Sequence, residues 1–234
     1  MDTRFYIILG VIILVFLIWL FSARKRIIRV YKKYLRVPSD KGYNGENIAA
    51  IAVQRLNLNI KFALVKGDLT DAYSHKSKTL YMSEAVKETN SLASVAIVSH
   101  ELGHAMQDKE KNFFFRLNYV LNVLTHFTNR FIVPLLIFGL LFKILHWPNE
   151  KIGDKLVLVS IILFGMHAFF KLLTIPIEYG ASRRALKFLT QNNLISKQEV
   201  GKVKHLLGVA AQTYIVGLFD DFILTAQKIQ NAFR

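Results

Sequence analysis

The sequence predicts a mainly α-helical integral membrane protein with about three transmembrane helices and a small β-sheet. Hydrophobic residues make up 53% of the 234-residue chain, although 20% of it is charged, and the mean hydropathy is +0.31. The high apolar content and the charged fraction are compatible if the apolar residues are concentrated in membrane spans and the charges lie outside them. Long apolar runs at residues 5–21, 131–146 and 156–176 supply the candidate spans.

The basic residues predict the orientation of the first span. The segment after it, residues 24–36, contains Arg and Lys but no acidic residue. A cleaved signal peptide is the alternative, but it would carry its positive charge before the apolar run. We therefore expect a retained anchor whose C-terminal end is cytoplasmic. The net charge of +15 then reflects topology and contact with the lipid bilayer. It does not indicate nucleic-acid binding, because no nucleic-acid recognition motif accompanies the basic run.

Four parts follow from this pattern: an N-terminal transmembrane anchor (1–22), a cytoplasmic part (23–126), a transmembrane hairpin (127–176) and C-terminal helices (177–234). Asn44 is positioned to cap a helix, and apolar alternation predicts strands at 60–65 and 79–82. The link near residue 150 carries no positive excess and is expected outside. Helices are predicted at 178–191 and after a capping box at 196–199, and the apolar stretch 206–218 should pack as an amphipathic helix.

One motif in the predicted cytoplasmic part has residues that could bind a metal ion. His100-Glu101-Leu102-Gly103-His104 has the His-Glu-x-x-His pattern, inside a helix predicted from about Ser91 to Asp108. Residues four apart share one helix face, so both imidazoles can reach one Zn²⁺. Glu101 can act as the catalytic base toward a zinc-activated water. The chain has no cysteine, so the remaining ligands must be His, Asp or Glu.

A catalytic zinc site needs a third protein ligand and an open position. Glu178 is the favoured candidate. It stands where the third span ends, and a carboxylate there is costly unless it has a partner such as a metal ion. Glu110 is the alternative, but that arrangement needs a glycine at position 107, where this chain has Gln107. Asp108 and His126 are the next candidates for the third ligand.

Several segments resemble the YugP-type neutral zinc metallopeptidase family: Tyr81-x-Ser83, residues 93–107, residues 176–185, Gly67 to Tyr73 and Ala210 to Tyr214. The resemblance covers most of the chain from about residue 25. It implies a membrane zinc peptidase with a zincin-like metalloprotease region, and it supports Glu178 as the third ligand. More distantly the chain is similar to HtpX-like and CAAX-prenyl endopeptidases, which carry Glu-x-x-x-Asp in this helix. Ser182 stands at that Asp position here.

The predicted function is zinc-dependent hydrolysis of peptide bonds in peptide or protein substrates, by an endopeptidase-type zinc metalloprotease. We place it as a multi-pass protein of the cell membrane with its active site on the cytoplasmic face. Tyr214 is a candidate oxyanion donor, and Thr79 to Met82 is the expected edge strand for the substrate. His167 and Lys171 are expected to face the helix bundle and the membrane interface, with a proton path as the alternative. The rival function is a non-catalytic membrane scaffold with a vestigial zinc site. The sequence leaves the oligomeric state open.

Overall fold

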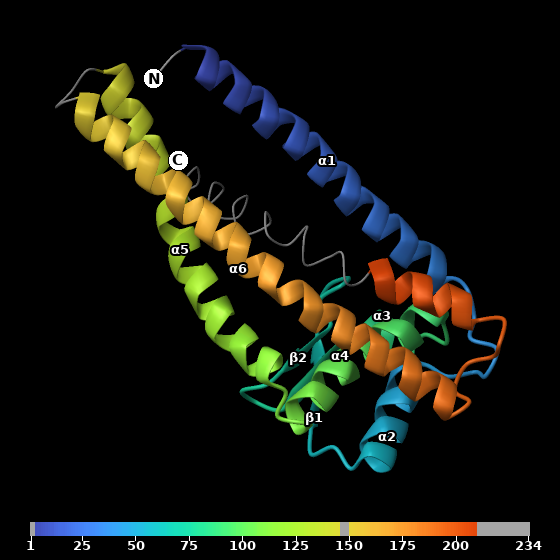
Figure 1. The fold of residues 1–234 in the computed structure, drawn as a ribbon. Helices are drawn as coiled ribbons and strands as arrows, with labels where there is room; N and C mark the ends of the chain where they lie inside the picture. The colour runs from blue at the N-terminus through green and yellow to red at the C-terminus, as the bar shows by residue number, and fades with distance from the viewer. Residues whose placement is uncertain (1–2, 146–149, 210–234) are drawn as a thin grey trace. The chain divides into compact units, whose positions relative to one another are not determined.

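A computed structural model describes residues 3–145 and 150–209 of the chain, without most of the side chains of residues 3–21 (Figure 1). The chain divides into two compact units. The first contains residues 1–110 and 179–216, and the second contains residues 111–178 and 217–234.

Two helices of the first unit, those that follow Asn44 and Ser91, begin where the sequence predicts. α1 (Thr3–Leu35) carries the predicted anchor and the basic segment on one continuous helix. α2 (Gly45–Leu56) opens on a capping box between Asn44 and Asn47, and it ends at Asn57, which adopts a left-handed backbone conformation. α3 (Glu84–Glu88) is a short helix. α4 (Leu92–Lys109) starts at Ser91, whose hydroxyl accepts a hydrogen bond from the backbone N–H of Ser94.

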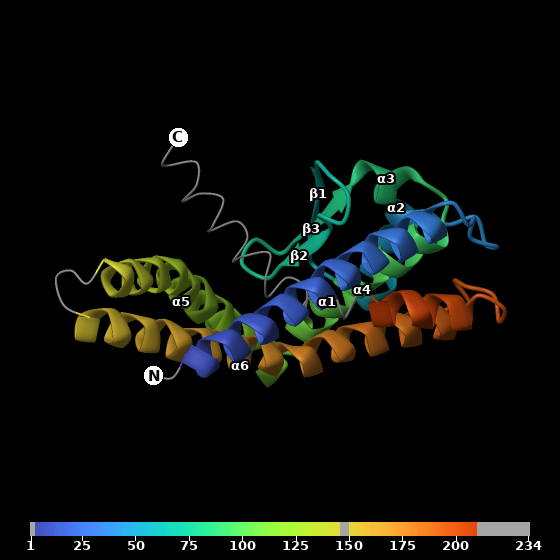
Figure 2. The same cartoon turned by 90° about the horizontal axis from the view of Figure 1, so that it is seen from above.

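The sheet of the first unit has three strands in the order β1-β3-β2 and lies on one side of α4 (Figure 2). β1 (Lys61–Val65) pairs in parallel with β3 (Thr79–Ser83), which confirms the two predicted strands. β2 (Ala72–Ser74) pairs antiparallel with the other side of β3. The expectation that Thr79 to Met82 is an edge strand is therefore wrong. The unpredicted β2 makes β3 the central strand, because it satisfies the hydrogen-bonding groups on the second side of β3.

Apolar side chains from the sheet, α2, α4 and the C-terminal part of α6 form the core of the first unit. It includes Ile48 from α2, Leu80 from β3, Val95 and Leu102 from α4, and Leu189 from α6. α4 is buried along most of its length. The helix that carries the motif is therefore packed from several sides.

The second unit is built on two long helices. α5 (Phe113–Ile144) begins before the predicted span, and α6 (Glu150–Gln191) joins the predicted third span and the helix after it into one, in spite of Pro176. Both are long and apolar enough to cross a membrane. Ser160 donates to the carbonyl of Ile132 at 2.8 Å, and His167 Nδ1 donates to the carbonyl of Thr125 at 3.3 Å. His167 thus faces the neighbouring helix, as expected.

The predicted capping box at the start of the last helix is present. The Ser196 N–H donates to Glu199 Oε2 at 2.7 Å, and the Glu199 N–H donates to Ser196 Oγ at 3.3 Å. The other carboxylate oxygen of Glu199 accepts from the N–H of Asp40 at 2.8 Å, which attaches the start of this helix to the loop before α2. The helix is described to residue 209. Most of the predicted amphipathic stretch 206–218 lies outside the described residues.

Candidate metal centre

The two histidines of the motif lie on one face of α4. The helix continues through the motif without a break, so residues 100 and 104 are one turn apart. Their rings approach edge to face with centroids 4.9 Å apart, and both side chains are buried. Each imidazole can therefore offer one nitrogen to a common point.

Glu178 supplies a carboxylate at the same point. One potential ligand atom each from His100, His104 and Glu178 lies within 4.8 Å of the others. Glu178 is the last residue of the second unit, and α6 continues directly into the first unit after it. It is fully buried, where a carboxylate requires compensation. Two imidazoles and one carboxylate form a donor set that fits Zn²⁺ and leaves a fourth position open.

The hydrogen bonds around the histidines select which ring nitrogen would face a metal. His104 Nδ1 lies 3.0 Å from Gln107 Oε1, an acceptor, so Nδ1 carries the proton. Ser182 Oγ donates to the carbonyl of Leu207 at 3.2 Å and lies 3.1 Å from His100 Nδ1. Because the hydroxyl proton is directed to Leu207, Ser182 accepts from His100 Nδ1–H. In both rings Nε2 then keeps its lone pair for a metal, as in zinc sites whose ligands are oriented by an outer hydrogen bond.

Ser182 therefore makes a contact that the sequence comparison left in doubt. Its position corresponds to the Asp of the distant endopeptidases, and its hydroxyl reaches the imidazole of His100 directly. A serine hydroxyl is a neutral acceptor, so it orients the ring without the charge that a carboxylate would add.

Glu101 is held by the edge strand β2. The backbone N–H of Tyr73 donates to Glu101 Oε2 at 2.8 Å. The hydrogen bond fixes one oxygen of the carboxylate, and Glu101 is only partly buried, so water can reach it. The arrangement suits a group that must exchange protons with water.

A polar cluster at the end of α4 anchors β2 a second time. The Tyr73 hydroxyl donates to Asp108 Oδ2 at 2.6 Å, and Lys78 Nζ lies 2.5 Å from the same oxygen. His75 Nδ1 lies 2.7 Å from the other oxygen. Burial raises the pKa of the Asp108 carboxyl, but hydrogen bonds from Lys78 and Tyr73 outweigh this effect and leave that pKa below its usual value.

The pKa of the Tyr73 phenol shifts in the opposite direction. Burial, followed by its hydrogen bond to Asp108, raises the pKa of Tyr73. The phenol therefore stays a neutral donor, and Tyr73 is attached to α4 at both Glu101 and Asp108. Sequence reasoning gave Tyr73 no role. The only signal was its place in the segment Gly67 to Tyr73, which resembles the peptidase family.

The alternative third ligand, Glu110, has a different role. It is the C-cap residue of α4, and its carboxylate accepts hydrogen bonds from Arg184 Nε at 3.1 Å and Nη2 at 2.5 Å. Within the described residues, the group that could hold a metal contains Glu178 and not Glu110. Tyr214, the candidate oxyanion donor, lies outside the described residues.

Small residues let α4 and α6 meet closely beside the candidate ligands. A Cβ added to Gly103 would lie 2.4 Å from the carbonyl oxygen of Ala181. A Cβ on Gly180 would lie 2.8 Å from the Gln107 amide that orients His104. Only glycine fits at position 103, where the near atoms belong to the backbone of α6, so backbone contact there fixes the spacing of the two helices.

Comparison with known proteins gives concordant results. A family model described as "Putative neutral zinc metallopeptidase" matches residues 6–227. The chain is 30% identical over 209 residues to "Putative membrane protease YugP" of Bacillus subtilis (strain 168), and the alignment covers 86% of this chain and 87% of that protein. No solved structure matches.

Proposed function

Because the chain belongs to this family of zinc metallopeptidases, we propose that it is a membrane-embedded endopeptidase. In this proposal His100, His104 and Glu178 hold the catalytic Zn²⁺, and Glu101 is the general base. The single observation that carries the proposal is the convergence of the three buried ligand atoms within 4.8 Å. The orientation of both imidazoles through Nδ1 supports it.

Zinc and Glu101 have separate roles in the proposed reaction. Bound zinc supplies Lewis acidity, which lowers the pKa of water to about 7 and polarises a carbonyl group. The Glu101 carboxylate takes a proton from the attacking water and transfers it to the amide nitrogen that leaves. The N–H of Tyr73 keeps Glu101 Oε2 in place, which orients the carboxylate. A vestigial site would have no use for a carboxylate positioned in this way.

The outer edge of β2 is our candidate surface for the substrate. β2 pairs with β3 on one side only within the described residues, and its Tyr73 N–H faces Glu101. Glu101 already occupies the Tyr73 N–H, so a peptide lying along this edge would donate to the Tyr73 carbonyl and run past the candidate base. The substrate edge is thus assigned to β2, in place of the segment expected from the sequence.

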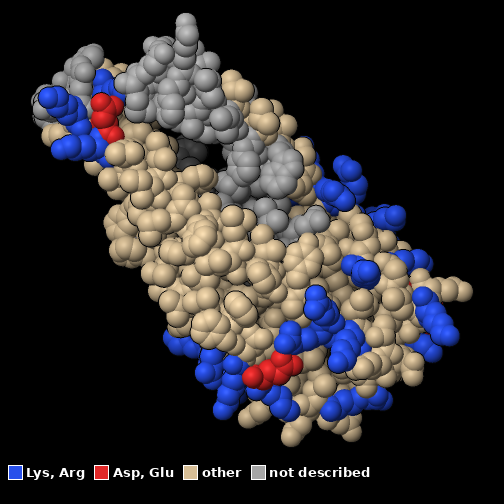
Figure 3. Space-filling model, viewed as in Figure 1, with Lys and Arg blue, Asp and Glu red and all other residues tan. Residues whose placement is uncertain are grey.

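Membrane embedding is supported by the distribution of residues on the hairpin of α5 and α6. Many exposed positions between the charged ends of the hairpin are apolar, such as Leu158, Ile162 and Phe169, with 52–57% exposure, whereas Ser160 and His167 are buried. Figure 3 shows a broad uncharged surface beside the charged loop end of the hairpin, where Lys143 and Asp154 pair at 2.8 Å. Water would favour the reverse distribution, and lipid favours the observed one.

The proposed topology adds the N-terminal anchor to this hairpin. The basic residues after residue 22 place that side in the cytoplasm. The proposed parts are the anchor (1–22), the cytoplasmic part (23–126), the hairpin (127–176) and the C-terminal helices (177–234). The active site then faces the cytoplasm, and the loop near residue 150 is outside. The name of the Bacillus protein, a membrane protease, supports membrane embedding alone.

Replacing Glu101 by glutamine tests the catalytic role directly. The amide keeps the size of the side chain but cannot accept the proton. Zinc content should therefore stay unchanged while cleavage of a quenched peptide library falls by at least ~10²-fold. Wild-type activity would remove Glu101 from the mechanism. Full zinc content without any peptidase activity in the wild type would favour the scaffold.

A further inference from the structure

The opposite edge of the sheet, at β1, presents backbone groups that nothing in the described part of the chain covers. The N–H of Lys61 donates to the carbonyl of Lys78 at 2.7 Å, so Lys61 faces β3. Because backbone direction alternates along a strand, the N–H and C=O groups of Phe62 and Leu64 point away from the sheet. These two residues can therefore bond a further strand.

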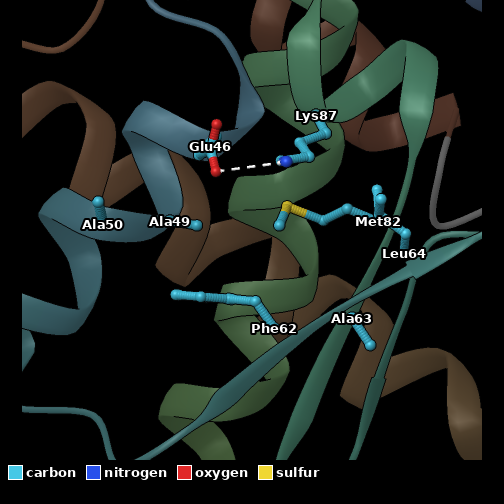
Figure 4. Close-up of a pocket in the computed structure, with 8 residues that line it drawn as sticks. All are labelled: Glu46, Ala49, Ala50, Phe62, Ala63, Leu64, Met82 and Lys87. Atoms are coloured by element: carbon cyan, nitrogen blue, oxygen red, sulfur yellow. Dashed lines mark ion pairs between the residues drawn. The ribbon is translucent and has the colours of Figure 1, made fainter.

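The same two residues line an apolar groove between β1 and α2. Phe62 and Leu64 are 48% and 62% exposed, and they border a cavity of about 250 Å³ together with Ala49, Ala50 and Met82. Figure 4 shows Phe62 reaching toward α2 below Ala49. The alanines leave room above the sheet, so an added strand could insert side chains between itself and α2. An ion pair of Glu46 with Lys87 at 3.5 Å borders the groove.

The charges at both ends of β1 restrict what can bind there. Lys61 and Lys66 are exposed and flank the strand, and residues 58–67 contain no acidic residue. A second copy of β1 would bring further lysines to this edge, and lysine on an edge strand opposes such self-pairing. An acidic strand is attracted instead.

We propose that β1 is a docking edge for an extended segment of another protein, with apolar residues at alternate positions and acidic residues at both ends. The segment adds antiparallel to β1 as a fourth strand. The apolar residues of the segment lie opposite Phe62 and Leu64. Their side chains enter the groove, and their backbone groups exchange hydrogen bonds with the backbone of Phe62 and Leu64. β1 and the strand at Glu101 are opposite edges of the sheet. Docking is therefore independent of metal binding and of cleavage.

Peptide binding to the full-length Glu101→Gln protein in detergent tests this proposal separately from catalysis. The probe is a short fluorescent peptide in which valine alternates with threonine and glutamate stands at both ends. It should bind with or without a zinc chelator. The same peptide with terminal lysines should bind at least about tenfold more weakly. N-methylation of the valines should abolish binding, whereas N-methylation of the threonines should not.

Protein variants locate the binding surface. Phe62→Thr with Leu64→Thr keeps β-propensity at exposed positions and should weaken binding about tenfold or more. Lys61→Glu with Lys66→Glu should also weaken it. The matched control is Lys187→Glu with Lys202→Glu, which changes two exposed lysines elsewhere by the same charge and should bind as the parent does.

Three outcomes would overturn the proposal. The first is equal binding by the parent and the threonine variant, provided that both melt at similar temperatures. The second is insensitivity to both N-methylated peptides, which would exclude strand pairing. The third is absence of peptide binding by the parent protein itself, which would leave the edge without the proposed occupant.

Discussion

Gly103→Ala tests whether the contact between α4 and α6 sets the geometry of the metal centre. The new Cβ would lie 2.4 Å from the carbonyl oxygen of Ala181 and 2.9 Å from its Cα. Both atoms belong to the backbone of α6, so no side chain can rotate away. Ordinary contact would require the helices to separate by about 1 Å. Glu178 and Ser182 lie on the same segment of α6, so they would move away from the two histidines.

The expected losses follow from this displacement. Overpacking should lower the free energy of unfolding by about 1–3 kcal/mol, which most folds survive. A shift of about 1 Å in a reacting centre costs about 10²-fold in rate. Zinc affinity should fall by about 10- to 100-fold, because the orientation of His100 by Ser182 is disturbed. Competition with a fluorescent chelator measures affinity, and cleavage of a quenched peptide measures rate.

Gly201→Ala provides the control, since no atom lies within 4 Å of its added Cβ and the residue is in a helix. Alanine there should leave zinc affinity and cleavage unchanged and should raise stability by up to about 1 kcal/mol. Normal zinc affinity and cleavage in a folded Gly103→Ala protein would refute the reasoning that the α4–α6 spacing sets the site.

Further predictions concern the third ligand, the β2 anchor and topology. Glu178→Ala should lose zinc while Glu110→Ala keeps it. The zinc stoichiometry of both variants, measured in the same detergent, tests this, and the reverse result would reject Glu178 as the third ligand. Because the pKa of Asp108 is lowered, its ionised form stabilises the fold above the ordinary value of about 3.9, and this contribution disappears as the pH falls through the folded-state pKa. Asp108→Asn should therefore lower stability by about 1–3 kcal/mol at pH 7, and chemical denaturation should show the difference shrinking at low pH. Cysteines introduced near residue 70 should be shielded from an impermeant reagent in intact cells and those near residue 150 labelled; labelling near residue 70 would reverse the topology.

Local patterns predicted the helix that carries the motif. Helical spacing is a property of neighbouring residues, so α4 could be predicted from the sequence with His100 and His104 on one face. The strand at residues 79–83 was also predictable from alternation and propensity. Its central position was not, because β2 is only three residues long and is stabilised by partners distant in the sequence, Glu101 and Asp108.

The amino-acid sequence limited the chemistry available: a chain without cysteine, with a His-Glu-x-x-His motif, long apolar runs and basic flanks. It favoured Glu178 over Glu110 through the cost of a carboxylate beside a span. Packing of distant segments brings Glu178 to the histidines, lets Ser182 orient the ring of His100, and places the Tyr73 N–H on Glu101. These contacts join residues up to 82 positions apart. They depend on how closely two helices can pack, which is set by backbone contact at Gly103 and cannot be derived from local propensity.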